Sequence, residues 1–336
     1  MLALVSIVIP VFNQKEAYLL RCVTSALAQN HPNLEVIVSD NHSTNGCIKV
    51  LSEITDSRLA IVKPPFHLPL VQHFAFAGFQ AHGEYISFLP SDDWLQPNWL
   101  QPMLKTMTSH PDASIAYCDV YRHNMITNQV SRYRGNRFVS KFLSSDEAIK
   151  VFGKFICKDT SAYMIGALVK SKNYFKCGGF HDTGASYAGD ACMGLGLLKY
   201  GGVVYINEAL ANYTIWTSEQ GKIDEQYAVA ACLDIAKVLV CAECDPALLE
   251  IANVAGFSFK KMRVRLTIFF LLNYIQQLIE DEKTNIDYAS FQVALKIISK
   301  GWVPIWVSSV FKLSIVINIM SFLRKKFGEK AKSKFL

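Results

Sequence analysis

The chain has little charge and lacks the commonest glycine-rich nucleotide loops. Charged residues make up 18% of its 336 residues and hydrophobic residues 51%, which excludes a chain dominated by disorder. No GxGxxG follows the first apolar run and no GxxxxGK[ST] occurs anywhere. The familiar dinucleotide and phosphate loops are therefore excluded. The length fits two ordinary domains, or one α/β domain with a large appendage.

The chain also lacks a paired cysteine pattern and a signal peptide. Its nine cysteines include one close pair, Cys241 and Cys244, with no second pair at zinc-site distance. Ordinary thiols are therefore favoured over a metal or redox site. The opening "MLALVSIVIPVFN" has no basic n-region or cleavage site, which favours a strand over a signal peptide. These features predict a reduced, cytoplasmic protein.

The first ninety residues alternate short apolar strands with amphipathic helices. Helices are expected over 13–29, with Asn13 as N-cap, and over 70–83, with Gly83 as the stop. The alternation predicts a parallel sheet with right-handed crossovers. The strands are expected over 4–12, 34–40, 57–65 and 84–90.

Polar residues follow the expected strands at the edge where such sheets bind ligands. Asn13, Asp40 and the pair Asp92 and Asp93 all occupy such positions. The pair ends the stretch "YISFLPSDDW". Adjacent carboxylates repel, so the pair sits in water, caps a helix or holds a cation.

Further along, a glycine-rich loop precedes Asp190, which heads an apolar, helix-like run. From about residue 219 the pattern becomes long and helical. We therefore place a boundary there, with a first domain over 1–218, divided at 115/116 into two halves. A helical C-terminal region follows over 219–336.

Four segments in order resemble family 2 glycosyltransferases of the GT-A fold. They run from Val5 to Tyr213: "VSIVIPVFN", "VIVSDNHSTN", "GEYISFLPSDDWLQP" and "AGDACMGLGLLKYGGVVYINEALANY". The resemblance implies an α/β GT-A fold, a Rossmann-like, mostly parallel sheet with helices on both faces. A C-terminal helical extension is expected to follow it. The resemblance further implies that residues 1–115 form a nucleotide-sugar-binding half and residues 116–218 an acceptor half.

The resemblance also implies roles for particular residues. Asp93 would hold Mn²⁺ or Mg²⁺, and a hard cation of this kind suits a carboxylate at a strand end. Asp190 would act as the general base toward the acceptor. The implied nucleotide-sugar contacts are Pro10, Phe12 and Asn13 in the first loop, Asp40 toward the uracil imide, and Asp92 near the ribose or donor sugar.

Plainer interpretations stand beside these roles. Ser91 or Asp92 suits a helix cap, Asp190 suits an N-cap, and Asn13 suits a helix start. Asp40 suits an Asx turn, because its surroundings are rich in turn formers.

The chain departs from the family pattern in two places. Gly189 precedes Asp190 where the family usually has Glu. Thr214, Ile215 and Trp216 follow Tyr213 where many members have Arg and then His. Positive charges or hydrogen-bond donors to replace the missing Arg and His are available at Lys63, His67 and His73.

The expected activity is an inverting, metal-dependent transfer of a sugar to a hydroxyl of a saccharide acceptor. The donor is a nucleotide-sugar, with a UDP-sugar favoured. The sugar moved is a hexose or an N-acetylhexosamine. Lipid-linked acceptors in O-antigen, capsule or exopolysaccharide synthesis fit the resemblance. The alternative is a non-catalytic nucleotide-sugar-binding or scaffold protein. Nucleic-acid binding is disfavoured, because the basic tail 324–335 carries only two aromatic residues and no recognised module accompanies it.

Two C-terminal segments, 263–279 and 302–326, are apolar and flanked by basic residues. A membrane span, an interfacial helix and a buried helix are all compatible with them. Interfacial attachment is favoured, because Trp302, Trp306 and the basic tail suit an anionic cytoplasmic leaflet. The expected location is peripheral, at the inner face of the plasma membrane.

Overall fold

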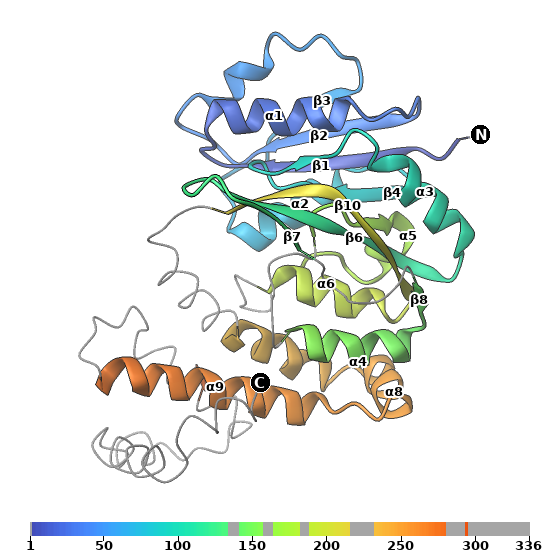
Figure 1. Cartoon of the computed structure of the whole chain (residues 1–336), viewed down its shortest axis with the longest axis vertical. Helices are drawn as coiled ribbons and strands as arrows, with labels where there is room; N and C mark the ends of the chain where they lie inside the picture. Colours follow the sequence, from blue (N-terminus) through green and yellow to red (C-terminus); the bar gives the residue numbers. More distant parts are fainter. Residues whose placement is uncertain are drawn as a thin grey trace. The chain divides into compact units, whose positions relative to one another are not determined.

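The computed structural model describes residues 2–133, 141–156, 164–181, 188–215, 232–279 and 293–294. The chain forms two compact units, each made of several segments (Figure 1). The first comprises Met1–Ile149, Ser161–Asp182 and Cys192–Gln220, and the second comprises Lys150–Thr160, Thr183–Ala191 and Gly221–Leu336. The boundary placed at 218/219 from the sequence stays a prediction.

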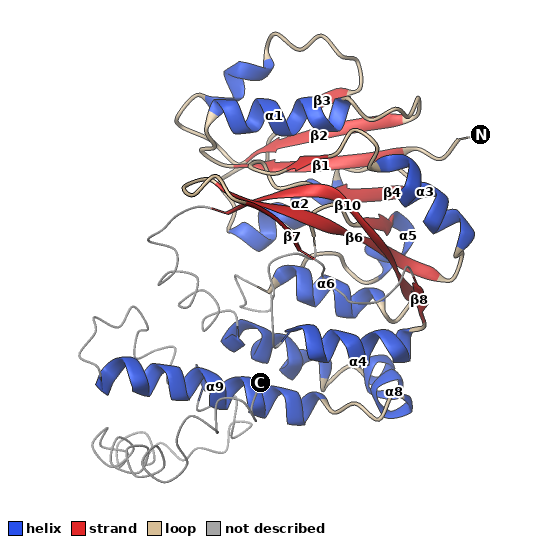
Figure 2. Ribbon diagram, viewed as in Figure 1, coloured by secondary structure: helices blue, strands red, loops and turns tan. Residues whose placement is uncertain are grey.

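Four parallel strands form the N-terminal half of the sheet of the first unit (Figure 2). Their order is β3-β2-β1-β4, with β1 pairing in parallel to both β2 and β4. Every residue of β1 is buried, as expected for a β-branched run covered on both faces. The predicted strands are confirmed as β1 (Val5–Val11), β2 (Leu34–Asp40), β3 (Leu59–Val62) and β4 (Tyr85–Phe88).

The other half of the sheet is mixed. β9 (Leu168–Lys170) runs antiparallel between β4 and β6 (Ala113–Asn124), and β6 pairs in parallel with β10 (Gly202–Ile215). The short β5 (Trp94–Leu95) lies antiparallel to β10. β7 (Val130–Tyr133) extends from β6, and β8 (Lys141–Leu143) from β10.

Helices cover both faces of this sheet. One apolar layer contains α1 (Glu16–Leu27), the 3₁₀ helix η1 (Cys47–Leu51) and α3 (Leu100–Ser109). The other contains α2 (Leu70–Phe79), α5 (Ser171–Lys176) and the later turns of α6 (Gly189–Leu197). Helix α4 spans Ser145–Ile156. The predicted α/β fold of the GT-A type, with helices on both faces, is confirmed.

The second unit contains α8 (Pro246–Val254) and α9 (Phe259–Ile279). The fully buried Arg263 of α9 pairs with Glu243, with Nε 2.5 Å from Oε1. Cys241 and Cys244 are exposed and form no disulfide. Within the described ranges, no helix combines the length and apolar character needed to cross a bilayer. Segment 302–326 and the basic tail lie outside those ranges.

One helix end differs from the expectation. Helix α2 ends at Phe79, and Gln80 takes the C-cap position in right-handed conformation, so Gly83 is not its stop. Gly83 instead packs against β1, where a Cβ atom would lie 2.7 Å from the backbone nitrogen of Ser6. The glycine is therefore required by close packing rather than by a helix cap.

Candidate active site

Asn13 joins two loops at the carboxyl ends of β1 and β2. Its φ is +48°, and its Oδ1 accepts the N–H of Thr44 at 2.7 Å and of Asn45 at 3.3 Å. Helix α1 begins later, with Lys15 as N-cap and no side-chain cap. The interpretation of Asn13 as N-cap is therefore wrong. Its side chain holds the loop after β2 instead.

Asp40 is the last residue of β2 and is 7% exposed. Its Oδ1 accepts the N–H of Ser43, three residues on, at 2.9 Å. The carboxylate therefore organises the turn after β2, although an Asx turn would use the N–H two residues on. Its Oδ2 lies 3.6 Å from Nζ of Lys63, which follows β3. The turn orients the carboxylate, and Lys63 is within reach to balance its charge.

Two aromatic rings lie at the same edge of the sheet. Phe12 follows β1 and is 50% exposed, and its ring centroid lies 4.7 Å from that of His67. His67 Nδ1 is 3.0 Å from the carbonyl oxygen of Asn41. Asn41 holds the His67 loop with its amide, which donates to the carbonyl of Leu68 and accepts its N–H. An exposed aromatic ring therefore follows β1 at the edge where Asp40 ends β2.

Two residues near this edge lie deeper. Pro10 is a buried residue within β1, opposite Ser39 of β2. His73 of α2 is 2% exposed, its Nε2 lies 3.0 Å from Oγ of Ser39, and burial lowers its pKa to about 4. A neutral, enclosed imidazole is a packing residue, so His73 supplies no positive charge here.

The aspartate pair lies between β4 and β5. Asp93 is 1% exposed, and its Oδ1 accepts the N–H of Thr214 in β10 at 2.7 Å. Burial, followed by the nearby charge of Asp92, raises the pKa of Asp93 well above its usual range. Strand β5 comes next, and α3 begins at Leu100 without a side-chain cap. The interpretation of Ser91 or Asp92 as a helix cap is therefore wrong.

Arg21 of α1 is a site residue that sequence reasoning missed. Its Nη2 donates to the carbonyl oxygen of Asp92 at 2.9 Å, and its guanidinium lies 3.6 Å from the ring centroid of Trp94. Thr214 Oγ1 donates to the same carbonyl at 2.7 Å. No motif in the sequence pointed to Arg21. Thr214 was noticed only because it departs from the family pattern. Together they fix the aspartate loop and put a positive charge beside it.

The carboxylates of the aspartate loop meet only part of what a hard divalent cation requires. Among the described residues, no three His, Cys, Asp or Glu side chains gather into a metal cage. Mg²⁺ in nucleotide sites usually takes one or two carboxylates and completes its shell with phosphate and water. Asp93 fits that requirement, since a buried carboxylate whose charge is disfavoured gains from a nearby cation.

Asp190 lies in the first turn of α6 and belongs to the second unit. The helix begins at Gly189, so Asp190 is inside it rather than at the N-cap. Its Oδ1 accepts the N–H of Ala191 at 2.8 Å. The residue is partly exposed, yet burial of its carboxyl group raises the pKa to about 6.

Comparison with solved structures supports the fold. A structure of TarS residues 1–349 from S. aureus in complex with UDP-GlcNAc is 14% identical and aligns with a TM-score of 0.57, covering 89% of this chain and 80% of that one. The mannosyltransferase PcManGT from Pyrobaculum calidifontis, in complex with GDP-Man and Mn²⁺, is also 14% identical. It aligns with a TM-score of 0.55 and covers 98% of this chain and 88% of that one.

Comparison with sequences points to one family. An uncharacterized glycosyltransferase of Haemophilus influenzae is 30% identical over 164 residues, 44% of this chain and 64% of that protein. The Escherichia coli protein WfaP, a UDP-Glc:alpha-D-GlcNAc-diphosphoundecaprenol beta-1,3-glucosyltransferase, is 36% identical over 91 residues, 27% of this chain and 36% of that protein. The chain spans less than two thirds of the curated relatives it matches first. Residues 6–168 match the model of Glycosyl transferase family 2. This segment, slightly less than half of the chain, is therefore similar to glycosyl transferase family 2.

Proposed function

We propose that this protein is an inverting glycosyltransferase that moves a sugar from a UDP-sugar to a hydroxyl of a saccharide acceptor. One observation carries the proposal. The oriented carboxylate of Asp40 and the Asp92–Asp93 loop lie at one edge of a sheet, within the segment that is similar to glycosyl transferase family 2. Ligands of open α/β sheets bind at that edge.

The donor would be held at its base by the first two loops. Asp40 would accept the N–H of the uracil imide, and Phe12 would cover the ring face. Asn13 keeps the loop after β2 in place. We infer that UDP is the preferred nucleotide, because uracil offers an imide N–H to a carboxylate acceptor.

Asp93 would hold Mn²⁺ or Mg²⁺, with Asp92 near the ribose or the donor sugar. When bound, the cation would neutralise charge on the departing diphosphate. The chain's own contribution is to keep Asp93 buried and oriented by the Thr214 N–H, with the loop carbonyl fixed by Arg21.

Asp190 would act as the general base. A pKa of about 6 leaves its carboxyl ionised at neutral pH while making it a better proton acceptor than an ordinary aspartate. As the acceptor oxygen attacks the anomeric carbon, its proton passes to Asp190 and the bond from that carbon to the diphosphate oxygen breaks. One displacement inverts the anomeric configuration, so no covalent enzyme intermediate is needed.

The acceptor is proposed from the relatives. WfaP is named for transfer to a diphosphoundecaprenol-linked sugar, which supports a lipid-linked saccharide and a place in surface-polysaccharide synthesis. Such an acceptor lies at a membrane, so we place the enzyme at the inner face of the plasma membrane, attached through its C-terminal region.

The test is nucleotide release from UDP-, GDP- and dTDP-sugars, with and without Mn²⁺. The wild-type protein is expected to hydrolyse a UDP-sugar slowly and only with the metal. Asp93→Asn is expected to abolish this turnover, whereas Asp112→Asn, at an exposed residue outside the site, should leave it unchanged. Metal-independent turnover, or an active Asp93→Asn variant, would contradict the proposal.

A scaffold protein that binds nucleotide-sugar without turning it over is the second candidate. The observation in its favour is Thr214, which stands where many family members have Arg and a following His. Tight binding of a UDP-sugar, with no release in the presence of Mn²⁺ and lipid-linked saccharides, would favour this candidate.

A further inference from the structure

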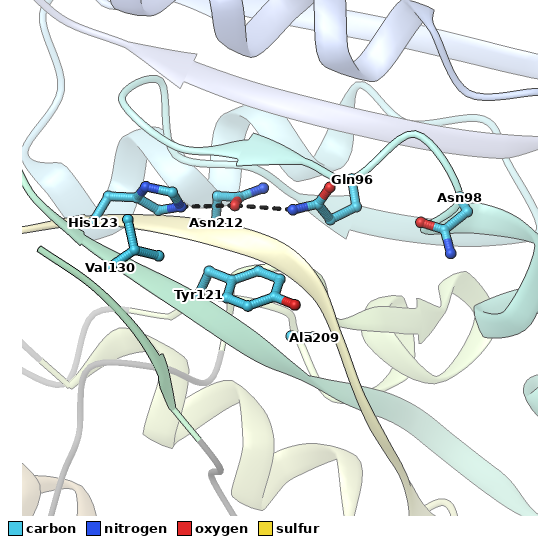
Figure 3. Close-up of a pocket in the computed structure, with 7 residues that line it drawn as sticks. All are labelled: Gln96, Asn98, Tyr121, His123, Val130, Ala209 and Asn212. Carbon is cyan, nitrogen blue, oxygen red and sulfur yellow. Dashed lines mark hydrogen bonds between the residues drawn. The ribbon is translucent and has the colours of Figure 1, made fainter.

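A polar groove opens beside the aspartate loop in the first unit (Figure 3). Its volume is about 530 Å³, which is within the range of small-molecule sites. Strands β6, β7 and β10 and the segment between β5 and α3 contribute to it. Its polar side chains are Gln96, Asn98, Tyr121, His123 and Asn212.

Asn212 organises this groove. Its Nδ2 donates to the carbonyl oxygen of Trp94 at 3.2 Å, which fixes the orientation of the amide because a carbonyl only accepts. Its Oδ1 therefore faces Nε2 of Gln96 at 3.1 Å and Nε2 of His123 at 2.9 Å. Figure 3 shows these three side chains in a row.

The row determines what the groove offers a ligand. Since an amide oxygen only accepts, Nε2 of His123 carries the proton, and Nδ1 of the neutral ring is an acceptor. The Oε1 end of Gln96 is an acceptor, and the exposed Asn98 offers both a donor and an acceptor. Tyr121 adds an aromatic ring with a hydroxyl.

This chemistry fits a neutral, hydroxyl-rich ligand. None of the described residues that line the groove is Asp, Glu, Lys or Arg, so it offers no cation to a diphosphate. Sugar hydroxyls donate and accept at once, which amide side chains match, and the apolar face of a pyranose covers an aromatic ring. A saccharide is therefore favoured over the nucleotide part of the donor.

The groove is directly connected to the aspartate loop. Trp94 follows Asp93 in the chain, and its ring centroid lies 4.5 Å from that of His123. Asn212 precedes by two residues Thr214, whose N–H binds Asp93. Strand β10, which holds Asp93 through Thr214, therefore also lines the groove.

We propose that this groove binds the saccharide acceptor, with Asn98, Tyr121 and His123 as its contact residues and Asn212 as the residue that positions His123. The proposal rests on the proposed transferase function. It assigns the surface that selects the acceptor.

The test uses the full chain and a panel of methyl glycosides of glucose, galactose, mannose and N-acetylglucosamine with their disaccharides, followed by saturation-transfer NMR. At least one probe is expected to bind in the millimolar range, about 4 kcal/mol. Asn98→Ala and Tyr121→Ala should each weaken that probe about tenfold, a loss of about 1.4 kcal/mol. Gln101→Ala removes an exposed amide of α3 that bonds to the carbonyl of Asn30, and it should change nothing.

UDP binding, measured by calorimetry on the same proteins, separates this proposal from the proposed function. Unchanged UDP affinity in the two groove variants, with saccharide binding lost, supports an acceptor site. The acceptor proposal is overturned if the wild type binds no probe, or if both variants bind it as the wild type does. Neither result affects the proposed donor site. Weakened UDP-sugar binding in both variants would assign the groove to the donor. Asn98 is exposed, so its variant keeps the test valid if Tyr121→Ala does not fold.

Discussion

The carboxyl group of Asp190 is harder to ionise than an ordinary aspartate, because burial raises its pKa to about 6. If Asp190 is the base, transfer should increase tenfold per pH unit below about pH 6 and level off above it. Asp190→Asn should lower the transfer rate by about 10²- to 10⁴-fold while UDP affinity stays unchanged. Rate measurements from pH 4.5 to 8.5 check both. A flat profile, or a variant at wild-type rate, would remove Asp190 from the mechanism.

The raised pKa of Asp190 also makes the stability of the folded protein depend on pH. The pKa of Asp190 is higher in the folded protein than its usual 3.8, so the folded state binds the proton more tightly. This contribution to stability is present below about pH 4 and is lost as the pH rises through about 6. The free energy of unfolding of Asp190→Asn, measured with urea, should therefore rise relative to that of the wild type as the pH increases from about 4 to about 6. A difference that does not vary with pH would contradict the assignment.

Arg21 tests whether the aspartate loop depends on its charged neighbour. Arg21→Met removes the donor to the carbonyl of Asp92 and the cation over Trp94. We expect the free energy of unfolding to fall by about 1.5–3 kcal/mol, the value of a hydrogen bond from a charged group. Lys105→Met, at an exposed position of α3, should stay within about 0.5 kcal/mol of wild type. Equal effects of the two substitutions would show that Arg21 is not a structural support.

At the scale of elements, the sequence predicted strands better than the connections between them. Segment 34–40 was predicted as a strand and is β2, because a short β-branched run bounded by turn residues has few other solutions. Asn13 was misread, since a residue that caps a helix and one that bonds across 31 positions have the same type. The contact of Thr214 with Asp93 joins residues 121 positions apart. Local pattern carries no information on such pairs.

Helix α2 depends on a small residue where it meets α5. A Cβ atom added at Gly78 would lie 2.3 Å from Oη of Tyr174 and 2.7 Å from Cζ of Phe88. Gly78→Ala should therefore lower the free energy of unfolding by about 1–3 kcal/mol through overpacking, although alanine favours a helix by about 1 kcal/mol. Tyr174→Phe in the same chain should recover part of the loss, because the nearest atom is removed. Denaturant unfolding of the single and double variants measures this, and a stabilised Gly78→Ala would contradict the packing.

At the scale of the whole molecule, the proposed lipid-linked acceptor requires the protein to reach a membrane surface. No helix in the described part of the chain is suited to cross a bilayer, whereas the tail 324–335 is strongly basic. Clustered Lys and Arg contribute about 1 kcal/mol each near an anionic surface, and salt screens them. The full chain should therefore sediment with phosphatidylglycerol vesicles in low salt and less in high salt.

Charge reversal tests the interfacial interpretation of the C-terminal region against the other two, a membrane span and a buried helix. With Arg324, Lys325 and Lys326 changed to Glu, an interfacial attachment should lose most of its vesicle binding, and neutral phosphatidylcholine vesicles should bind neither protein well. Nucleotide release from a UDP-sugar should stay unchanged, because none of the residues proposed to bind the donor or the metal is altered. Vesicle binding unaffected by the reversal would mean that apolar insertion dominates. Binding absent from the wild type as well would favour the alternative, in which residues 302–326 form a helix that packs within the protein.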